Sequence, residues 1–545
     1  MSKKIPLGIS NFKEIIEENY YYIDKTKFID DLIQDGSKVK LFTRPRRFGK
    51  TLNMSTLRYF FDIVDAEKNR KLFKDLYIEK SETFKYQGQY PVIFISLKEL
   101  KSQTYDELLD SIRTLISEVF YTFEFLIDKL DEFTSPLFKS YILKTSKVNE
   151  LNNSLKFLSK IIYRHMGKRV IIIIDEYDTP VVSAYEHGYY NEAISFFKTF
   201  FGVALKDNEY LQMGIMTGIL RVAKEGIFSG LNNLITYSIL DENYSSYFGL
   251  TEKEVKKALF DFEIEDKVNE VKDWYDGYLF GNTELYNPWS IINYLSKKKL
   301  EPYWVNTSNN FLVYDLLNKA KIDIFNDLQT VFQGKPIYKT LDNSFSFQDM
   351  NNPQEVWQLL LYSGYLKISE ILPESKYALK IPNKEINSFF EKSFLNRFLG
   401  GIDLFQEMIG ALENQKINLF EKKLQEIMLV SVSYNDLGKE EKYYHNLILG
   451  MILSMSKNYE IHSNSESGYG RYDISLEPND KTKAGIILEI KVAKFRDELD
   501  KKLEEALKQI EKRGYDTVMR QRGIKKILKI GLAFYGKEIK IKYSE

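Results

Sequence analysis

Short apolar runs alternate with longer helical patterns from about residue 38 to residue 240. The runs are rich in β-branched residues, and they cover Val39–Thr43, Val92–Leu97, Val170–Ile174 and Leu211–Thr217. The run from Val170 to Ile174 is apolar at every position, which is typical of a strand buried on both faces and placed at the centre of a sheet. The alternation predicts a parallel sheet covered by helices.

The pattern changes twice further along the chain. From about residue 250 to 400 it is mainly helical, with two apolar stretches, Gly364–Ile368 and Tyr377–Ile381, that would suit a hairpin in a small winged-helix or lid module. From about residue 415 onward the pattern predicts two helices, Glu441–Ser456 and Leu499–Arg513. It also predicts strands at Tyr459–Ser463, Arg471–Leu476, Ile486–Ile490, Ile527–Phe534 and Ile539–Tyr543. A chain of 545 residues is longer than one hydrophobic core usually organises. We therefore predict an α/β multidomain protein with domains at 1–250, 251–400 and 401–545.

Composition narrows the classes of protein that the chain can belong to. There is no cysteine, which excludes disulfides, thiolate metal sites and a cysteine nucleophile. The net charge is zero, so bulk charge does not indicate a nucleic-acid binder, and the basic lean of residues 491–545 is read as a solvated helix face. Without a signal-peptide pattern or a long apolar run, we expect a cytoplasmic protein with no membrane partner.

A phosphate-binding loop is predicted between the first strand and the helix that follows it. Backbone N–H groups at the helix N-terminus would surround phosphate, Lys50 would contact the β and γ oxygens, and the Thr51 hydroxyl would bind Mg²⁺. Arg44 stands where the motif ordinarily has its first glycine. We expect ATP as the ligand, bound by Arg47, Phe48, Gly49, Lys50 and Thr51.

The second half of this site lies at the ends of two later strands. The buried apolar run ends in Asp175 and Glu176, where Asp175 would hold the Mg²⁺ shell and Glu176 would polarise water. The next strand ends in Thr217, which could sense the γ-phosphate, and Arg221 follows near the same edge. Gly-Lys-Thr also occurs by chance and strand-end polar residues are often only caps. The two halves together favour the nucleotide site.

A second constellation of charged residues is predicted in the C-terminal region. Asp473 lies in one strand candidate and Glu489 and Lys491 close the next, with a turn-rich stretch between them that suits a hairpin. Residues two apart in a strand share a face, so Glu489 and Lys491 would project together. Two carboxylates can hold Mg²⁺ and a lysine can orient or deprotonate water, as phosphodiester hydrolysis requires. An exposed Glu-x-Lys ion pair is the alternative.

The flanking helices add polar residues to this constellation. Gln509 comes from the helix that follows and is counted among the catalytic candidates. Glu441 and His445, four residues apart, share one face of the helix that precedes the strands. The order helix, strands, helix favours a nuclease over a surface ion pair.

The sequence resembles the bacterial AAA-ATPase-like proteins that carry a C-terminal PD-(D/E)xK nuclease-superfamily domain. The resemblance spans nearly the whole chain, and besides the phosphate loop and the Asp175–Glu176 strand end it rests on Tyr22–Thr26, Thr217–Ile219, Phe228–Asn233, Trp274–Tyr278, Tyr286–Ser290, Ser363–Leu366, Tyr444–Asn446, Gly470–Asp473 and Leu488–Lys491. The Arg-Pro-Arg-Arg-Phe-Gly-Lys form of the loop resembles that family's loop, which accounts for the missing glycine.

The resemblance implies a P-loop NTPase sheet, a helical or winged-helix-like middle region and a restriction-endonuclease-like α/β domain. It implies Asp175 and Glu176 as a Walker-B-like pair, and a nuclease core formed by Asp473, Glu489 and Lys491. The expected metal ligands are Thr51, Asp175, Asp473 and Glu489. The segment from Trp274 to Ser290 is rich in aromatic residues, and its role, as a lid contact or as core, is left open.

These features predict an ATP-binding and ATP-hydrolysing protein that controls a Mg²⁺-dependent nuclease-like domain acting on DNA or RNA. The alternative is a nucleotide-switched regulatory or scaffold protein whose nuclease fold only binds. A small-molecule kinase is placed last, because no substrate pocket is evident in the sequence. Self-association into a homo-oligomer stays open.

Overall fold

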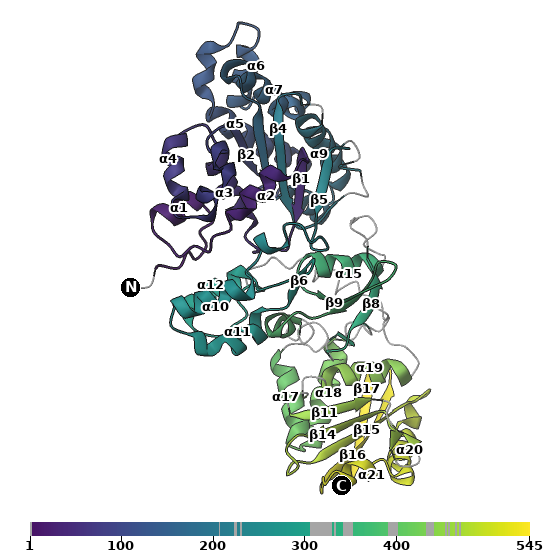
Figure 1. The fold of residues 1–545 in the computed structure, drawn as a ribbon. Helices are drawn as coiled ribbons and strands as arrows, with labels where there is room; N and C mark the ends of the chain where they lie inside the picture. Colours follow the sequence, from purple (N-terminus) through teal and green to yellow (C-terminus); the bar gives the residue numbers. More distant parts are fainter. Residues whose placement is uncertain are drawn as a thin grey trace. The chain divides into compact units, whose positions relative to one another are not determined.

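The computed structural model describes residues 3–206, 208–222, 226–228, 231–305, 334–341, 353–390, 402–431, 441–452, 458–463, 466–467 and 470–544, with the single positions 327, 330, 331 and 455 (Figure 1). Three expectations therefore lie outside the described residues: Ser229 and Gly230 of one motif, Ser456 at the end of a helix, and the domain boundary near 400. The chain divides into two compact units. Unit 1 comprises residues 1–316 and 336–386, and unit 2 comprises residues 317–335 and 387–545.

Unit 1 is built around a five-stranded parallel sheet in the order β2-β3-β4-β1-β5. The strands are β1 (Val39–Thr43), β2 (Val92–Ser96), β3 (Val170–Asp175), β4 (Leu211–Gly218) and β5 (Leu234–Tyr237). All six residues of β3 are buried, and the strand lies inside the sheet between β2 and β4, as its apolar run predicts. The parallel sheet is confirmed, and β5 is a strand that the sequence analysis missed.

Helices pack around this sheet (Figure 1). Their bounds are α1 (Phe12–Glu17), α2 (Lys27–Gln34), α3 (Lys50–Phe61), α4 (Ala66–Arg70), α5 (Tyr105–Tyr121), α6 (Ser135–Ile142), α7 (Val148–Met166), α8 (Thr179–His187) and α9 (Tyr190–Leu205). Local sequence sets several of these ends. The side chain of Thr104 caps α5 by accepting a hydrogen bond from Glu107 N, and Gly167 ends α7 in the left-handed conformation.

The remainder of unit 1 consists of helices and two small antiparallel sheets. The helices are α10 (Glu252–Asp261), α11 (Val268–Tyr275), α12 (Pro288–Lys297) and α15 (Pro353–Tyr362). One sheet pairs β6 (Tyr278–Phe280) with β7 (Thr283–Leu285), and the other has the order β8-β10-β9, with β8 (Ile337–Thr340), β9 (Lys367–Leu372) and β10 (Lys376–Lys380). The predicted hairpin is confirmed as β9 and β10. The winged-helix interpretation stays a prediction.

Unit 2 has its own sheet and its own core. The sheet order is β11-β14-β15-β16-β17, with β11 (Tyr459–Ser463), β14 (Ile474–Pro478), β15 (Gly485–Val492), β16 (Ile527–Tyr535) and β17 (Glu538–Ser544). Only the β15–β16 pair is parallel. The short strands β12 (Glu466–Ser467) and β13 (Gly470–Arg471) form a separate ribbon. The helices are α17 (Ile402–Glu413), α18 (Ile417–Ser431), α19 (Glu441–Ile452), α20 (Leu499–Arg513) and α21 (Thr517–Gln521).

Apolar alternation explains how this sheet is covered on both faces. Ile486, Leu488 and Ile490 of β15 belong to the core that includes side chains of α17, α18 and α19. Ile487, from the alternate set, packs with Ile510 of α20 instead. The predicted α/β architecture with a C-terminal mixed sheet is confirmed. In the part of the chain that the model describes, no helix is both long enough and apolar enough to cross a membrane.

Candidate functional site

The loop between β1 and α3 is shaped by one glycine and one buried lysine. Gly49 has a φ of 79°, in the left-handed region, and serves as the N-cap of α3. The Lys50 side chain is buried, and its ammonium donates to the carbonyl oxygens of Arg44 and Pro45 at 3.0 and 2.8 Å. Burial lowers the pKa of Lys50, while nearby carboxylates, Glu176 first, oppose that shift. The loop thus presents a concentrated positive charge at a helix N-terminus.

Asp175 is the point on which the predicted site residues converge. It ends β3, and its two carboxylate oxygens accept from Thr51 Oγ1 at 2.8 Å and from Thr217 Oγ1 at 2.5 Å. Thr217 reaches it because β4 lies between β1 and β3. Burial raises the pKa of Asp175, and the two hydroxyl donors oppose this. Thr51, Asp175 and Thr217, far apart in the sequence, therefore form one hydrogen-bonded cluster beside Lys50.

Glu176 and Arg221 are placed differently around this cluster. Glu176 has a φ of 54°, its N–H donates to Thr217 Oγ1 at 3.2 Å, and its negative charge acts on both Lys50 and Arg47. It therefore faces the loop. Arg221 follows β4, and its buried Nε has no hydrogen-bond partner among the described residues. No hydrogen bond links Arg221 to Asp175 in the described part of the site.

Arg44, which replaces the usual first glycine, is a buried structural residue. Its guanidinium donates to the carbonyl oxygens of Thr43 and Tyr237 at 2.9 and 2.7 Å and lies over the rings of Phe248 and Phe280. Burial lowers its pKa to about 9. The Arg44 side chain fills the space beneath the loop, where it ties β1 to the end of β5.

Aromatic residues from the segment that follows the sheet hold the outer side of the loop. The Arg47 guanidinium lies 4.3 Å from the Trp289 ring centroid, and Phe48 packs against Tyr278 and Phe280. Trp304 Nε1 donates to the carbonyl oxygen of Arg46 at 3.1 Å. We call these contacts of Trp289, Trp304, Tyr278 and Phe280 the aromatic clamp. The segment left open by the sequence analysis thus contacts the loop directly.

The buried carboxylate of Glu385 is hydrogen-bonded to two segments that carry residues of the aromatic clamp. Glu385 accepts from Ser290 Oγ at 2.7 Å and from Trp304 N at 2.6 Å, so it joins α12 to the segment that carries Trp304. Burial raises its pKa to about 7. At the start of α12, Asn287 accepts from Trp289 N and thereby fixes the helix entry. Trp304 and Glu385 were both missed by the sequence analysis, because no motif marks them.

The second cluster lies in unit 2, where β14 and β15 run side by side. Asp473 precedes β14, and its carboxylate accepts from Ile490 N at 2.7 Å. Glu489 and Lys491 share a face of β15, and Lys491 Nζ lies 3.0 Å from Glu489 Oε1 and 3.3 Å from Glu441 Oε1. His445 Nε2 lies 3.0 Å from the Asp473 carbonyl oxygen. The structure brings these three predicted residues together, with Glu441 and His445 of α19 beside them.

The electrostatics of this cluster fit a divalent cation. Glu489 is 1% exposed, and its second oxygen, Oε2, has no hydrogen-bond partner among the described residues. Burial and then the Asp473 charge raise the pKa of Glu489 to about 7, although Lys491 opposes both. A buried carboxylate oxygen without a donor is costly unless a cation binds it. Asp473 and Glu489 thus form an oxygen pair of the kind that Mg²⁺ takes.

Comparisons with known proteins match these two regions separately. Residues 6–228 match the family described as "Predicted AAA-ATPase", and residues 439–544 match the PD-(D/E)XK nuclease superfamily. Residues 6–228 therefore form an AAA-ATPase-like domain, and residues 439–544 form a domain of the PD-(D/E)XK nuclease superfamily. It is also 25% identical to a protein of Azotobacter chroococcum mcd 1 described as "Uncharacterized protein in vnfD 5'region", over 96% of this chain and 94% of the relative. The predicted resemblance is confirmed.

The remaining catalytic candidate of the PD-(D/E)XK domain is Gln509. Its side chain donates to the Tyr515 hydroxyl at 3.1 Å, and Tyr515 packs against Tyr472, the neighbour of Asp473. Glu505, one turn earlier on α20, is close enough to Lys491 for the lysine charge to help lower its pKa, after its own contact with Lys502. Among the described residues no hydrogen bond joins Gln509 to Asp473 or Glu489, and its catalytic role stays a prediction.

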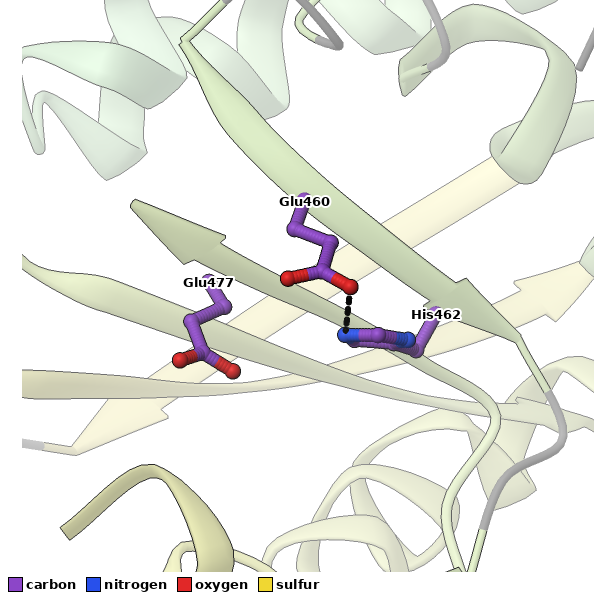
Figure 2. Close-up of side chains that lie close together, drawn as sticks. All are labelled: Glu460, His462 and Glu477. Carbon is purple, nitrogen blue, oxygen red and sulfur yellow. Dashed lines mark ion pairs between the residues drawn. The ribbon is translucent and has the colours of Figure 1, made fainter. Parts of the chain in front are cut away.

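Another group of possible metal ligands lies on the first strands of the PD-(D/E)XK domain. Figure 2 shows Glu460 and His462 of β11 beside Glu477 of β14, with an ion pair of 3.5 Å between His462 Nε2 and Glu460 Oε1. Glu477 is already paired with Arg522 at 2.6 Å. Because a guanidinium neutralises that carboxylate, we interpret this group as a charge-paired cluster.

Proposed function

We propose that the AAA-ATPase-like domain binds and hydrolyses ATP and that its nucleotide state controls a Mg²⁺-dependent nuclease activity of the PD-(D/E)XK domain on DNA or RNA. The observation that carries the first half is the convergence of Thr51 and Thr217 on Asp175 beside the buried Lys50. A hydroxyl and a carboxylate in contact, next to a lysine at a helix N-terminus, are the groups that Mg²⁺ and a triphosphate require.

Each residue of the nucleotide site takes a distinct role in this proposal. Lys50 would exchange its bonds to the loop carbonyls for bonds to phosphate oxygens, and Arg47 would add a second cation. Thr51 and Asp175 would hold the ion, while Thr217 would keep the Asp175 carboxylate oriented. Glu176 would orient the attacking water, because it follows Asp175 directly and already faces the two cations of the loop.

The second half of the proposal rests on Glu489 Oε2, a buried oxygen that has no hydrogen-bond partner among the described residues. Asp473 and Glu489 would hold Mg²⁺, which supplies charge stabilisation for a phosphodiester and lowers the pKa of water. Once the ion binds the Glu489 carboxylate in place of Lys491, the lysine would orient the water or offset phosphate charge. Glu441, which also contacts Lys491, would keep the ammonium in place.

The test is incubation of the purified chain with Mg²⁺ or Mn²⁺, with ATP or a non-hydrolysable analogue, and with single- and double-stranded DNA and RNA. Lys50→Ala should abolish ATP binding in calorimetric titration while circular dichroism stays unchanged. Glu176→Gln should bind ATP normally and lose hydrolysis by about 100-fold or more. ATP affinity of Lys50→Ala equal to that of the parent would contradict the nucleotide site.

Asp473→Ala tests the nuclease half on its own. It should remove metal-dependent cleavage of every nucleic acid that the parent cuts, and it should leave ATP hydrolysis nearly unchanged because the two sites lie in different units. Binding of nucleic acid without cleavage by the parent chain, in all metal and nucleotide conditions, would instead favour the regulatory or scaffold alternative.

A further inference from the structure

Strand β2 forms one edge of the parallel sheet in unit 1, so one side of its backbone faces away from any partner strand. In the register with β3, Ile171 N donates to Pro91 O at 3.0 Å and Leu97 N donates to Asp175 O at 2.9 Å. Alternate residues of a parallel strand bond to the same side. Val92, Phe94 and Ser96 therefore point their N–H and C=O groups outward from the sheet.

A pocket of about 770 Å³ runs along this outward edge. The same three residues of β2 line it, together with the end of α3 and one stripe of α5. The α5 stripe consists of Ser111, Thr114, Leu115 and Glu118, which recur at helical spacing on one face, and the C-cap residue Thr122 continues it. We call this pocket the β2-edge groove. It is long enough for an extended peptide, because α5 alone spans roughly 18 Å of it at ~1.5 Å per residue.

The chain itself already pairs with this edge at one end of the groove. Tyr90 N donates to Phe61 O at 3.0 Å and Ile63 N donates to Tyr90 O at 2.8 Å, which makes a parallel bridge between Asp62 and Tyr90. The Asp62 carboxylate then accepts from Val92 N. The edge therefore accepts extended backbone, and the chain's own pairing stops where the groove begins.

The charges around the groove define what kind of peptide fits it. Asp62, Glu99, Asp110 and Glu118 line it, against a single cation, Arg58, whose guanidinium lies over the Phe94 ring. Lys98 and Arg113 contact Glu99 and Asp110 from outside the lining. Glu118 is exposed and has no ion-pair partner in the described part of the chain. The groove is thus acidic, with hydroxyl groups between the carboxylates.

We propose that the β2-edge groove binds an extended basic peptide segment of a partner protein by strand addition to β2. The partner's backbone pairs with Phe94 and Ser96, and its Lys or Arg side chains meet Glu118 and the other carboxylates. Backbone hydrogen bonds provide affinity, and the carboxylates that line the groove provide sequence specificity. This site lies on the sheet edge and does not depend on the proposed nucleotide or nuclease chemistry.

The test measures binding of a fluorescein-labelled decapeptide of alternating Lys and Val to the full chain by fluorescence anisotropy. We expect saturable binding that a Glu-Val decapeptide does not show, and that a Lys-Val decapeptide N-methylated at alternate residues loses. The N-methylated probe keeps the charge and removes strand pairing. Equal binding of the N-methylated probe, equal binding of the Glu-Val probe, or failure of the Lys-Val probe to bind would each overturn the proposal.

Two variants locate the binding to the groove. Glu118→Lys should weaken the Lys-Val probe about tenfold, which corresponds to about 1.4 kcal/mol. Its matched control is Glu132→Lys, an equal charge change at an exposed position outside the groove, which should leave affinity within twofold. Ser96→Pro removes an outward N–H without touching the ladder to β3 and should also weaken binding. Equal weakening by Glu132→Lys and Glu118→Lys would show a non-specific charge effect and overturn the proposal.

Discussion

The buried carboxylate of Glu489 destabilises the folded chain, and the same property makes it suited to bind a cation. Its carboxylate is buried beside Asp473, and among the residues that the structure describes only Oε1 has a partner, the Lys491 ammonium at 3.0 Å. Burial of an incompletely paired charge destabilises a fold. A divalent cation at this point would remove both the repulsion and the unpaired oxygen.

We predict that Mg²⁺ stabilises unit 2 through Glu489. At a concentration about 100 times its dissociation constant, the ion should add about 2.7 kcal/mol to the free energy of unfolding of the parent. Glu489→Gln should lose this gain and yet match or exceed the metal-free stability of the parent, because the substitution removes a buried charge and keeps an acceptor for Lys491. Scanning calorimetry with and without Mg²⁺ measures both effects. The same Mg²⁺-induced gain in the variant would exclude Glu489 as a ligand.

Residue-scale chemistry was predictable where a motif fixes it. The positions of Lys50, Asp175, Asp473 and Glu489 follow from short patterns, and the structure brings each of them beside its expected neighbours. Arg44 was recognised only as a missing glycine. Its structural role depends on carbonyl groups of Tyr237 and on rings of later segments, which no local pattern reveals.

At the scale of elements, the aromatic clamp links α12 and β6 to the loop between β1 and α3. Asn287 and Pro288 set the start of α12, and this start places Trp289 against Arg47. The sequence analysis saw the aromatic enrichment and left its role undecided, since a buried core and a loop contact have the same composition. The structure shows a loop contact, because the partners of the aromatic clamp are Arg46, Arg47 and Phe48.

We predict that Trp289 positions Arg47 for nucleotide binding. Trp289→Ala should remove a cation–π contact worth about 0.5 to 2 kcal/mol and weaken ATP binding several-fold, whereas Trp289→Phe should retain most of the affinity. Isothermal titration measures the dissociation constants. Trp274→Ala is the matched control, because Trp274 packs in the cluster of α10 to α12 and makes no contact with Arg47 that the model describes. Unchanged affinity in Trp289→Ala would contradict the positioning role.

Glu385 makes the stability of unit 1 depend on pH. Its pKa is raised from 4.5 to about 7, so the folded chain holds the proton more tightly than the unfolded chain does. The resulting stabilisation is fully present below pH 4.5 and is lost as the pH rises towards 7. Glu385→Gln should remove this loss, so between pH 4.5 and 7 the change in the free energy of unfolding should differ between parent and variant by on the order of 3 kcal/mol.

Urea unfolding followed by tryptophan fluorescence at several pH values measures this effect. The four tryptophans, Trp274, Trp289, Trp304 and Trp357, all lie in unit 1, so the signal reports that unit alone. Burial also raises the pKa of Asp62, to about 6. Asp62 therefore lowers the stability of parent and variant equally as the pH rises, and its effect cancels when the two pH profiles are compared. Identical pH profiles for parent and Glu385→Gln would show that Glu385 does not carry the effect.

At the scale of the whole molecule, two cores predict two unfolding transitions. Each unit buries its own apolar cluster, with α10 to α12 in unit 1 and the β14–β17 sheet in unit 2. Calorimetry should resolve two peaks. ATP with Mg²⁺ should raise the midpoint of the one that coincides with the tryptophan signal, and Mg²⁺ alone should raise the other. A single peak that shifts as one with either ligand would contradict independent units.

The parallel sheet and the C-terminal sheet could be predicted because apolar runs and strand-end motifs are local. The three-domain division at 250 and 400 stays a prediction, and contacts group the chain into two units instead. The sequence pattern changes at about residue 250, and the structure shows side-chain contacts across that position. Phe48 is fully buried by Tyr278 and Phe280, so residues on both sides of that point share one interior.

This shared interior bears on how such chains can be shortened or recombined. A fragment that stops at residue 250 would uncover Phe48 and Pro45 and lose the Trp304 bond to the loop, leaving an apolar surface beside the phosphate loop. We therefore expect that fragment to aggregate on expression. Gene fusions that place a different effector domain after the AAA-ATPase-like domain would have to include the segment through residue 386. That segment and the phosphate loop would then be transmitted together as one evolutionary module.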